Sequence, residues 1–111
     1  MGDNEIYIKQ GSSLIKRRLK DIIYIEALEN YLTLYTNVER FTVHFTIPTI
    51  ENQLPSEIFI RVHPSFIVNK RMIQAIKEDS LDLNVGGTLK NLPIDNSFRD
   101  LLRAEINMRA R

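Results

Sequence analysis

Apolar and polar residues alternate with a period of two through most of this chain, which restricts it to a fold built mainly from short β-strands. Successive side chains of a strand point to opposite faces, so this alternation buries one face of each strand. Residues 22–25 are all apolar and predict a central strand that is buried on both faces. Gly86 and Gly87 predict a two-residue hairpin turn. Strands are expected at residues 6–9, 14–18, 22–27, 31–36, 40–46, 59–63, 72–77, 81–85 and 88–90.

Two segments carry helical signals instead. Either Thr46 or Thr49 can cap a short helix that runs through Leu54 and stops at Pro55. Residues 97–100 have the pattern of a capping box, and apolar residues lie there at helical spacing, namely Phe98, Leu101, Leu102 and Ile106. The expected fold is therefore mostly β and antiparallel, with about eight to ten short strands, a short mid-chain helix and a C-terminal helix.

Composition limits the classes of function. The 111 residues suffice for one domain with its own core. The net charge is only +1, from 15 Lys and Arg against 14 Asp and Glu, so binding to nucleic acid requires the basic side chains to be sorted onto one face. The absence of cysteine excludes disulfides and zinc fingers and fits a reducing compartment. No apolar run could span a bilayer and no signal peptide opens the chain, so we expect a cytoplasmic protein without membrane contacts.

No motif indicates catalysis. His44 lies within a strand pattern, and neither it nor His63 belongs to a spacing used by metal sites. A phosphate-binding glycine loop and a nucleophile elbow are both missing. We therefore expect no enzyme, no metal site and no cofactor.

Residues 59–69 are the most informative segment. They begin as an alternating strand, break at Pro64, and continue as a short apolar turn that we expect Asn69 to close. Cationic groups suit DNA phosphates, and short hydrogen-bonding side chains suit base edges. A strand that runs into a turn with solvated charges explains this segment equally well. The polar side chains presented here and just after it are Arg61, His63, Ser65, Asn69, Lys70 and Arg71.

The order of several blocks resembles the LytTR DNA-binding domain. The most specific block is Arg-Val-His-x-Ser-aromatic-Ile-Val-Asn at residues 61–69, and the similarity extends over about residues 5–104. The resemblance implies an elongated all-β fold that binds double-stranded DNA as the output domain of a bacterial two-component response regulator. It also implies that loops, in place of a recognition helix, enter the grooves, and that domains sit on paired direct repeats. The supporting blocks are residues 21–27, 30–31, 42–43, 54–55, 73 and 92–94.

The resemblance places base contacts in three loops, at residues 30–33, 63–65 and 95–97. The base-contact candidates are Asn30, Thr33, His63, Ser65 and Asn96. Helix capping or turn geometry would explain Asn96 equally well, and Asn69 is expected to bond its own backbone. We expect these turns to share one cationic edge. Candidates for phosphate contacts are Lys16, Arg17, Arg18, Arg61, Lys70, Arg71, Lys90 and Arg99.

Two features depart from the family pattern. Pro64 stands where the family has Arg or another polar residue, so a contact through that side chain is lost and an altered sequence preference is expected. Nothing in residues 1–111 supplies a receiver domain, so the chain is either an excised domain or a stand-alone regulator; in the full-length protein, a receiver domain and a sensor kinase would be its partners. Dimerisation on DNA is compatible with paired repeats.

Two other classes compete with this interpretation. A β-barrel that binds single strands would need exposed aromatic side chains on one strand face for base stacking. A protein-interaction module would use an edge strand such as residues 6–9 to pair with a peptide.

Overall fold

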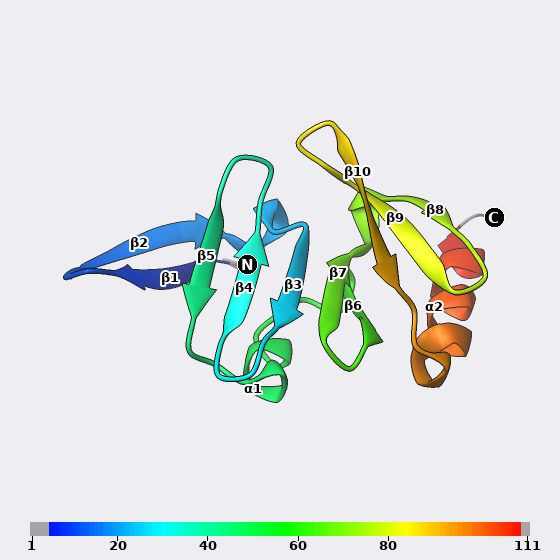
Figure 1. Ribbon diagram of the computed structural model, residues 1–111, viewed down its shortest axis with the longest axis horizontal. Coiled ribbons are helices and arrows are strands. Elements are labelled where there is room, and N and C mark those ends of the chain that lie inside the picture. Colours follow the sequence, from blue (N-terminus) through cyan, green and yellow to red (C-terminus); the bar gives the residue numbers. More distant parts are fainter. Residues whose placement is uncertain (1–4, 110–111) are drawn as a thin grey trace.

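The computed structural model describes residues 5–109, which form an elongated molecule with axis extents of 44 × 32 × 28 Å (Figure 1). A central five-stranded sheet in the order β5-β4-β3-β7-β6 lies between the β1–β2 hairpin and a three-stranded sheet in the order β10-β9-β8. All strand pairs in the described part are antiparallel, as expected. The strands are β1 (Glu5–Gln10), β2 (Ser13–Arg18), β3 (Tyr24–Ala27), β4 (Leu32–Tyr35), β5 (Arg40–Val43), β6 (Phe59–His63), β7 (Phe66–Asn69), β8 (Ile73–Ile76), β9 (Ser80–Val85) and β10 (Thr88–Pro93).

The helices are few and lie at the margins of the sheets. The short helix α1 (Ile47–Glu51) connects β5 to β6, and the longer α2 (Asn96–Arg109) follows β10. Two 3-10 turns, η1 (Leu19–Asp21) and η2 (Lys70–Met72), precede β3 and follow β7. The predicted plan of a β fold with one mid-chain and one C-terminal helix is confirmed.

Strands β3, β6 and β7 of the central sheet are buried on both faces because they belong to two cores at once, whereas β5 leaves one face exposed. Neighbouring residues Ile67 and Val68 of β7 point to opposite faces and enter different cores. The first core lies against the β1–β2 hairpin and α1, and includes Ile8, Ile25, Leu34, Ile50 and Ile67. The second lies against the three-stranded sheet and α2, and includes Ile23, Val68, Leu81, Leu83 and Leu102. This double burial explains the continuous apolar run at residues 22–25.

Several predicted boundaries are wrong. Residues 66–69 form strand β7 and not a turn; the turn is confined to Pro64 and Ser65. The run at 22–27 becomes strand only from Tyr24, because η1 ends immediately before Ile22. Strand β5 stops at Val43 and not at residue 46, since Thr46 caps α1 by accepting from the Thr49 N–H at 3.4 Å.

The start of α2 also differs from the prediction. Asp95, and not Ser97, caps this helix, because its carboxylate accepts the Ser97 N–H at 3.0 Å and its carbonyl accepts the Phe98 N–H at 2.9 Å. Leu102 is fully buried as expected, whereas Leu101 is 59% exposed and does not belong to the core.

Two hydrogen bonds tie the three-stranded sheet and α2 to the central sheet. One joins the turn between β9 and β10 to the segment between β4 and β5, where Gly86 N–H donates to Asn37 Oδ1 at 2.9 Å. The other joins the segment before α2 to β6, where Asp95 N–H donates to the Val62 carbonyl at 2.9 Å. Gly86 has φ of +60°, and a Cβ there would lie 2.9 Å from the Asn37 carbonyl oxygen, so only glycine fits this contact. The predicted Gly86–Gly87 hairpin turn is confirmed.

Asn69 is 1% exposed and satisfies three backbone groups, as expected from the sequence. Its Nδ2 donates to the carbonyls of Lys20 and Ile22 at 3.2 and 3.0 Å, and its Oδ1 accepts the Arg71 N–H at 2.9 Å. It therefore joins the two 3-10 turns across the end of β7.

We expect Asn69→Ala to lower the free energy of unfolding by about 2–3 kcal/mol, because buried backbone groups then lose their partners. Urea unfolding followed by circular dichroism measures the loss. Asn52→Ala is the matched control, since the exposed Asn52 side chain makes no hydrogen bond within the described residues, and it should change stability by less than about 0.5 kcal/mol. Equal losses in both variants would contradict the anchoring role of Asn69.

Candidate nucleic-acid interface

Three connecting segments meet along one edge of the molecule. The β3–β4 loop, the β6–β7 turn and the start of α2 lie together at the lower side of Figure 1. Ala27 N–H donates to the Ser65 carbonyl at 2.8 Å, and Asp95 N–H donates to the Val62 carbonyl at 2.9 Å, so each outer segment is bonded directly to β6–β7. We call residues 28–31, 63–65 and 95–97 the loop edge.

A hydrogen bond within the β6–β7 turn selects the tautomer of His63. His63 Nδ1 accepts the Ser65 N–H at 3.0 Å, and the imidazole ring lies 5.4 Å from the Phe66 ring. A neutral imidazole that accepts at Nδ1 carries its proton on Nε2. The half-buried His63 therefore presents an Nε2–H donor at the loop edge.

Pro64 packs beside the β3–β4 loop. A cavity of about 420 Å³ lies between them, and its lining includes Asn30, Tyr31, His44 and Pro64. The Asn30 side chain is exposed, and the exposed Pro64 offers an apolar surface next to it. This part of the loop edge combines an amide with a rigid apolar ring.

The structure narrows the predicted set of base contacts. Asn30 and Asn96 are exposed, and His63 and Ser65 are half-buried, so all four remain accessible. Thr33 is only 6% exposed because β4 lies between β3 and β5, and its side chain is not available to a base edge. Asn96 does not cap α2; its Oδ1 accepts from Arg99 Nη2 at 2.6 Å.

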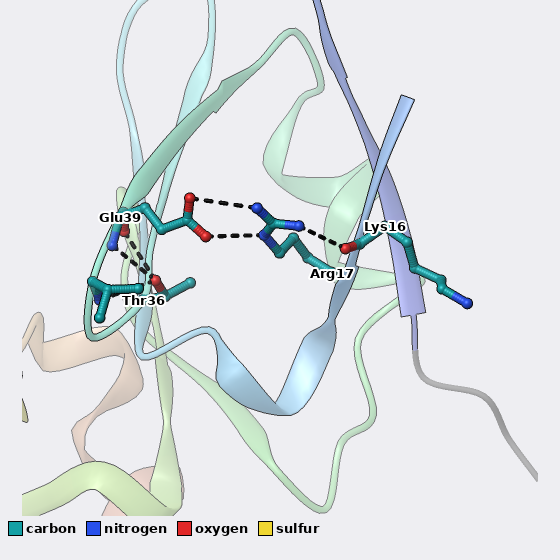
Figure 2. Close-up of polar contacts among 5 residues, drawn as sticks. Lys16, Arg17, Thr36 and Glu39 are labelled. Atoms are coloured by element: carbon teal, nitrogen blue, oxygen red, sulfur yellow. Dashed lines mark hydrogen bonds and ion pairs between the residues drawn. The ribbon is translucent and has the colours of Figure 1, made fainter. Parts of the chain in front are cut away.

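The predicted phosphate contacts are more dispersed than expected. Lys70 is 7% exposed and its Nζ lies 2.6 Å from Glu105 Oε1, so burial removes it from the candidates. Figure 2 shows Arg17 between the Glu39 carboxylate and the Lys16 carbonyl, at distances from 2.9 to 3.4 Å. The Arg17 guanidinium also lies 5.1 Å from the Phe41 ring centroid. Arg17 thus fastens β2 to the upper end of the central sheet.

Among the described residues, Arg18, Arg71 and Lys90 are the exposed candidates whose side chains make no ion pair. Arg18 precedes η1 and Arg71 lies in η2, so both stand at the end of the central sheet opposite the loop edge. Lys16 is weakly paired with Glu5 at 3.9 Å.

The loop edge carries mixed charge, which corrects the expectation of a shared cationic edge. Two ion pairs adjoin it. Arg99, which bonds Asn96, has its Nη2 2.9 Å from Asp79 Oδ1, and Arg61, which bonds the Pro64 carbonyl, has its Nη1 3.3 Å from Glu51 Oε1. Asp95 adds a negative charge beside His63. Hydrogen bonds from the Ser97 backbone N–H and then its side chain lower the Asp95 pKa, against a smaller opposing effect of desolvation.

The described residues contain no cluster of three or more His, Cys, Asp or Glu side chains that could hold a metal ion. None of the helices in this part of the chain has the length and apolar character needed to cross a membrane.

The described residues thus form an antiparallel β domain with three connecting segments along one edge. The model of the LytTr DNA-binding domain family matches residues 12–107, and the chain belongs to this family. Sensory transduction protein LytT of Bacillus subtilis is 36% identical over 76 residues, covering 68% of this chain and 32% of that protein. Transcriptional regulatory protein NatR of the same organism is 33% identical over 101 residues, covering 88% of this chain and 43% of that protein. This chain thus spans less than half the length of these relatives.

A solved structure supports the fold independently. The LytTr DNA-binding domain of a putative methyl-accepting/DNA response regulator from Bacillus cereus has a TM-score of 0.79 to this chain. The match covers 95% of this chain and 98% of that domain, at 24% sequence identity. The predicted family and fold class are confirmed, and the chain belongs to a family of DNA-binding domains.

We expect the Asp95 carboxylate to stabilise the fold in a pH-dependent way. Its pKa in the folded protein lies below the ordinary value of 3.8, so its contribution is complete above that value and is lost as the pH falls through the lowered pKa. The urea midpoint of the wild type minus that of Asp95→Asn should therefore shrink between about pH 5 and about pH 2.

Asp100→Asn serves as the control, because Asp100 is an exposed acid of the same helix without a hydrogen bond or ion pair in the described part. Its difference from the wild type should stay small over this range. A constant difference for Asp95→Asn would contradict the role assigned to the Ser97 hydrogen bonds.

Proposed function

We propose that this domain binds double-stranded DNA sequence-specifically and regulates transcription, with the loop edge entering the grooves. The observation that carries the proposal is the convergence of the β3–β4 loop, the β6–β7 turn and the start of α2 on one edge. Four accessible polar side chains lie on these three segments, namely Asn30, His63, Ser65 and Asn96.

Each accessible side chain suits a defined feature of the major groove. The His63 Nε2–H is a donor, and it matches the N7 or O6 acceptors of guanine, the N7 of adenine or the O4 of thymine. The Asn30 amide offers a donor and an acceptor side by side, which matches the N6 and N7 of adenine. The Pro64 ring can contact a thymine methyl group. Ser65 and Asn96 supply further donors and acceptors.

Phosphate contacts are expected to be few for each domain. Among the predicted phosphate candidates, Arg99 bonds a loop-edge side chain, Asn96. Arg99 also pairs with the exposed carboxylate of Asp79, and a DNA phosphate can replace that carboxylate at little cost. Arg18 and Arg71 face the opposite end, and a duplex along the loop edge would not need them. Specific contacts and paired binding would then supply much of the affinity.

We propose that the longer relatives provide the context for this domain. As the output domain of a response regulator, it would act in the cytoplasm, with a receiver domain and a sensor kinase as partners in the full-length protein. Two domains would meet on paired direct repeats. The printed names of the relatives, a sensory transduction protein and a transcriptional regulatory protein, support this assignment.

The competing classes have less support. Tyr24, Phe41 and Phe59 are at most 6% exposed, and the exposed aromatics Tyr7 and Phe45 do not share one strand face, which disfavours a stacking platform for single strands. One feature favours a protein surface as a second candidate. Tyr7 and Phe45 are 59% and 39% exposed and line an open cavity of about 540 Å³ beside the β1–β2 hairpin. Titration with matched duplex and single strands separates the main proposal from both alternatives.

We expect selection from a random duplex pool to return a motif in two copies, with centres spaced by about one or more helical turns. His63→Ala should weaken binding to that motif by about 1–3 kcal/mol and relax the preference at one position, because one donor to a base edge is removed. Gln10→Ala, an exposed amide at the far end of the β1–β2 hairpin, should leave the motif unchanged. A pool without enrichment would contradict sequence-specific binding.

We expect Arg99→Gln to lower the slope of log affinity against log salt by about 0.9, because one phosphate contact is lost. Arg71→Gln removes a positive charge at the opposite end and should leave the slope unchanged. Fluorescence anisotropy with one labelled duplex at several salt concentrations measures both slopes. The reverse result would mean that DNA lies along η2 and not along the loop edge.

A further inference from the structure

The β6–β7 turn uses its polar backbone atoms within the protein. The carbonyls of His63 and Pro64 accept hydrogen bonds from Arg61, at 3.3 Å and 2.7 Å. Ser65 N–H donates to His63 Nδ1, and the Ser65 carbonyl accepts from Ala27. Pro64 has no N–H to satisfy. The side chains of His63, Pro64 and Ser65 are therefore the groups that the turn offers most readily to a ligand.

Arg61 supplies the two bonds that hold the carbonyl side of this turn. Its Nε donates to the His63 carbonyl and its Nη2 to the Pro64 carbonyl, while its Nη1 lies 3.3 Å from Glu51 Oε1 at the end of α1. The guanidinium also lies 5.6 Å from the ring centroid of Phe98 in the first turns of α2. The planar Arg61 guanidinium thus contacts the β6–β7 turn and both helices. Its side chain is 24% exposed.

The conformation of the turn explains why it needs this support. Two-residue hairpin loops usually adopt turns with positive φ, which match the twist of the strands. No described non-glycine residue has a positive φ, so Pro64 and Ser65 cannot form such a turn. The pairing register instead shifts between Arg61 and His63, as in a β-bulge. A bulge redirects side chains, and external hydrogen bonds are required to fix where they point.

We propose that Arg61 is a positioning residue, which holds the 63–65 turn in the conformation that presents His63 to a base edge, and is not a phosphate contact. The inference rests on the proposed function for its effect on DNA. Lysine cannot replace arginine here, because an ammonium is a point charge and cannot bridge two carbonyls and a carboxylate in a planar fork. Loss of Arg61 should therefore reduce discrimination between sequences without weakening non-specific attraction.

The first test uses the protein without DNA. We expect the Ser65 amide to exchange its hydrogen about tenfold faster in Arg61→Lys and Arg61→Gln than in the wild type, with amides of β7 unchanged. Nitrogen-15 spectra should show a smaller share of the His63 tautomer protonated at Nε2. Arg71→Lys and Arg71→Gln are the matched controls and should alter neither signal. Unchanged Ser65 exchange in folded Arg61→Lys would overturn the proposal.

The second test measures affinity for the selected duplex and for a scrambled duplex over a range of salt. Both Arg61 variants should bind the selected duplex about tenfold more weakly and the scrambled one as before, with the same salt slope for each. A phosphate contact would give a different result and overturn the proposal. Arg61→Gln would then weaken binding equally to both duplexes and lower the salt slope by about one, and Arg61→Lys would restore the wild-type affinity. A wild type that does not distinguish the duplexes would refute the proposed function, and the exchange measurement would still decide the role of Arg61.

Discussion

Burial of the inner strands of the central sheet on both faces is the constraint on which the rest of the structure depends. Strands β3 and β7 have apolar side chains on each face, and neither face can be left in water. The β1–β2 hairpin with α1 covers one face, and the three-stranded sheet with α2 covers the other (Figure 1). Because the same strands serve both cores, the loops that leave them at one end are fixed relative to both layers.

The positions of the three segments in the candidate interface are set mainly by the rigid sheet, and few further contacts are needed to hold them. Its three segments are joined by backbone hydrogen bonds from Ala27 and Asp95, and its turn is completed by Arg61 and His63. Most charged groups beside it are paired within the protein. The domain therefore fits DNA recognition through positioned side chains better than recognition through bulk charge, in keeping with its net charge of +1.

Much of the fold could be predicted from the sequence, because period two, the glycine pair and the capping threonine are local signals. The sequence does not predict the strand at Phe66–Asn69, since a short apolar run after proline has no period that separates strand from turn. The sequence also does not decide the cap of α2, because Asp95 and Ser97 are both good caps and only the backbone geometry selects Asp95.

The site was harder to predict for a different reason. A basic residue in a sequence has no visible partner, so the sequence predicts phosphate contacts for both Arg61 and Lys70. Their partners include the carbonyl of Pro64 and the carboxylate of Glu105, and the fold alone brings Lys70 to a residue 35 positions away. The family resemblance implies a base contact for the loop that includes Thr33, whereas the burial of Thr33 depends on the neighbours that the fold packs around it.

The contact between Gly86 and Asn37 has a mechanical consequence. Together with the bond from Asp95 to Val62, it attaches the outer sheet at both ends, so that sheet cannot swing about the short η2 connection as about a hinge. The separation between the Asn30 loop and the Asn96 loop is then a fixed length. Under the proposed function, a duplex along the loop edge has to match that length. Where the match requires bending or twisting, sequences that deform easily would be favoured even at base pairs that no side chain reaches.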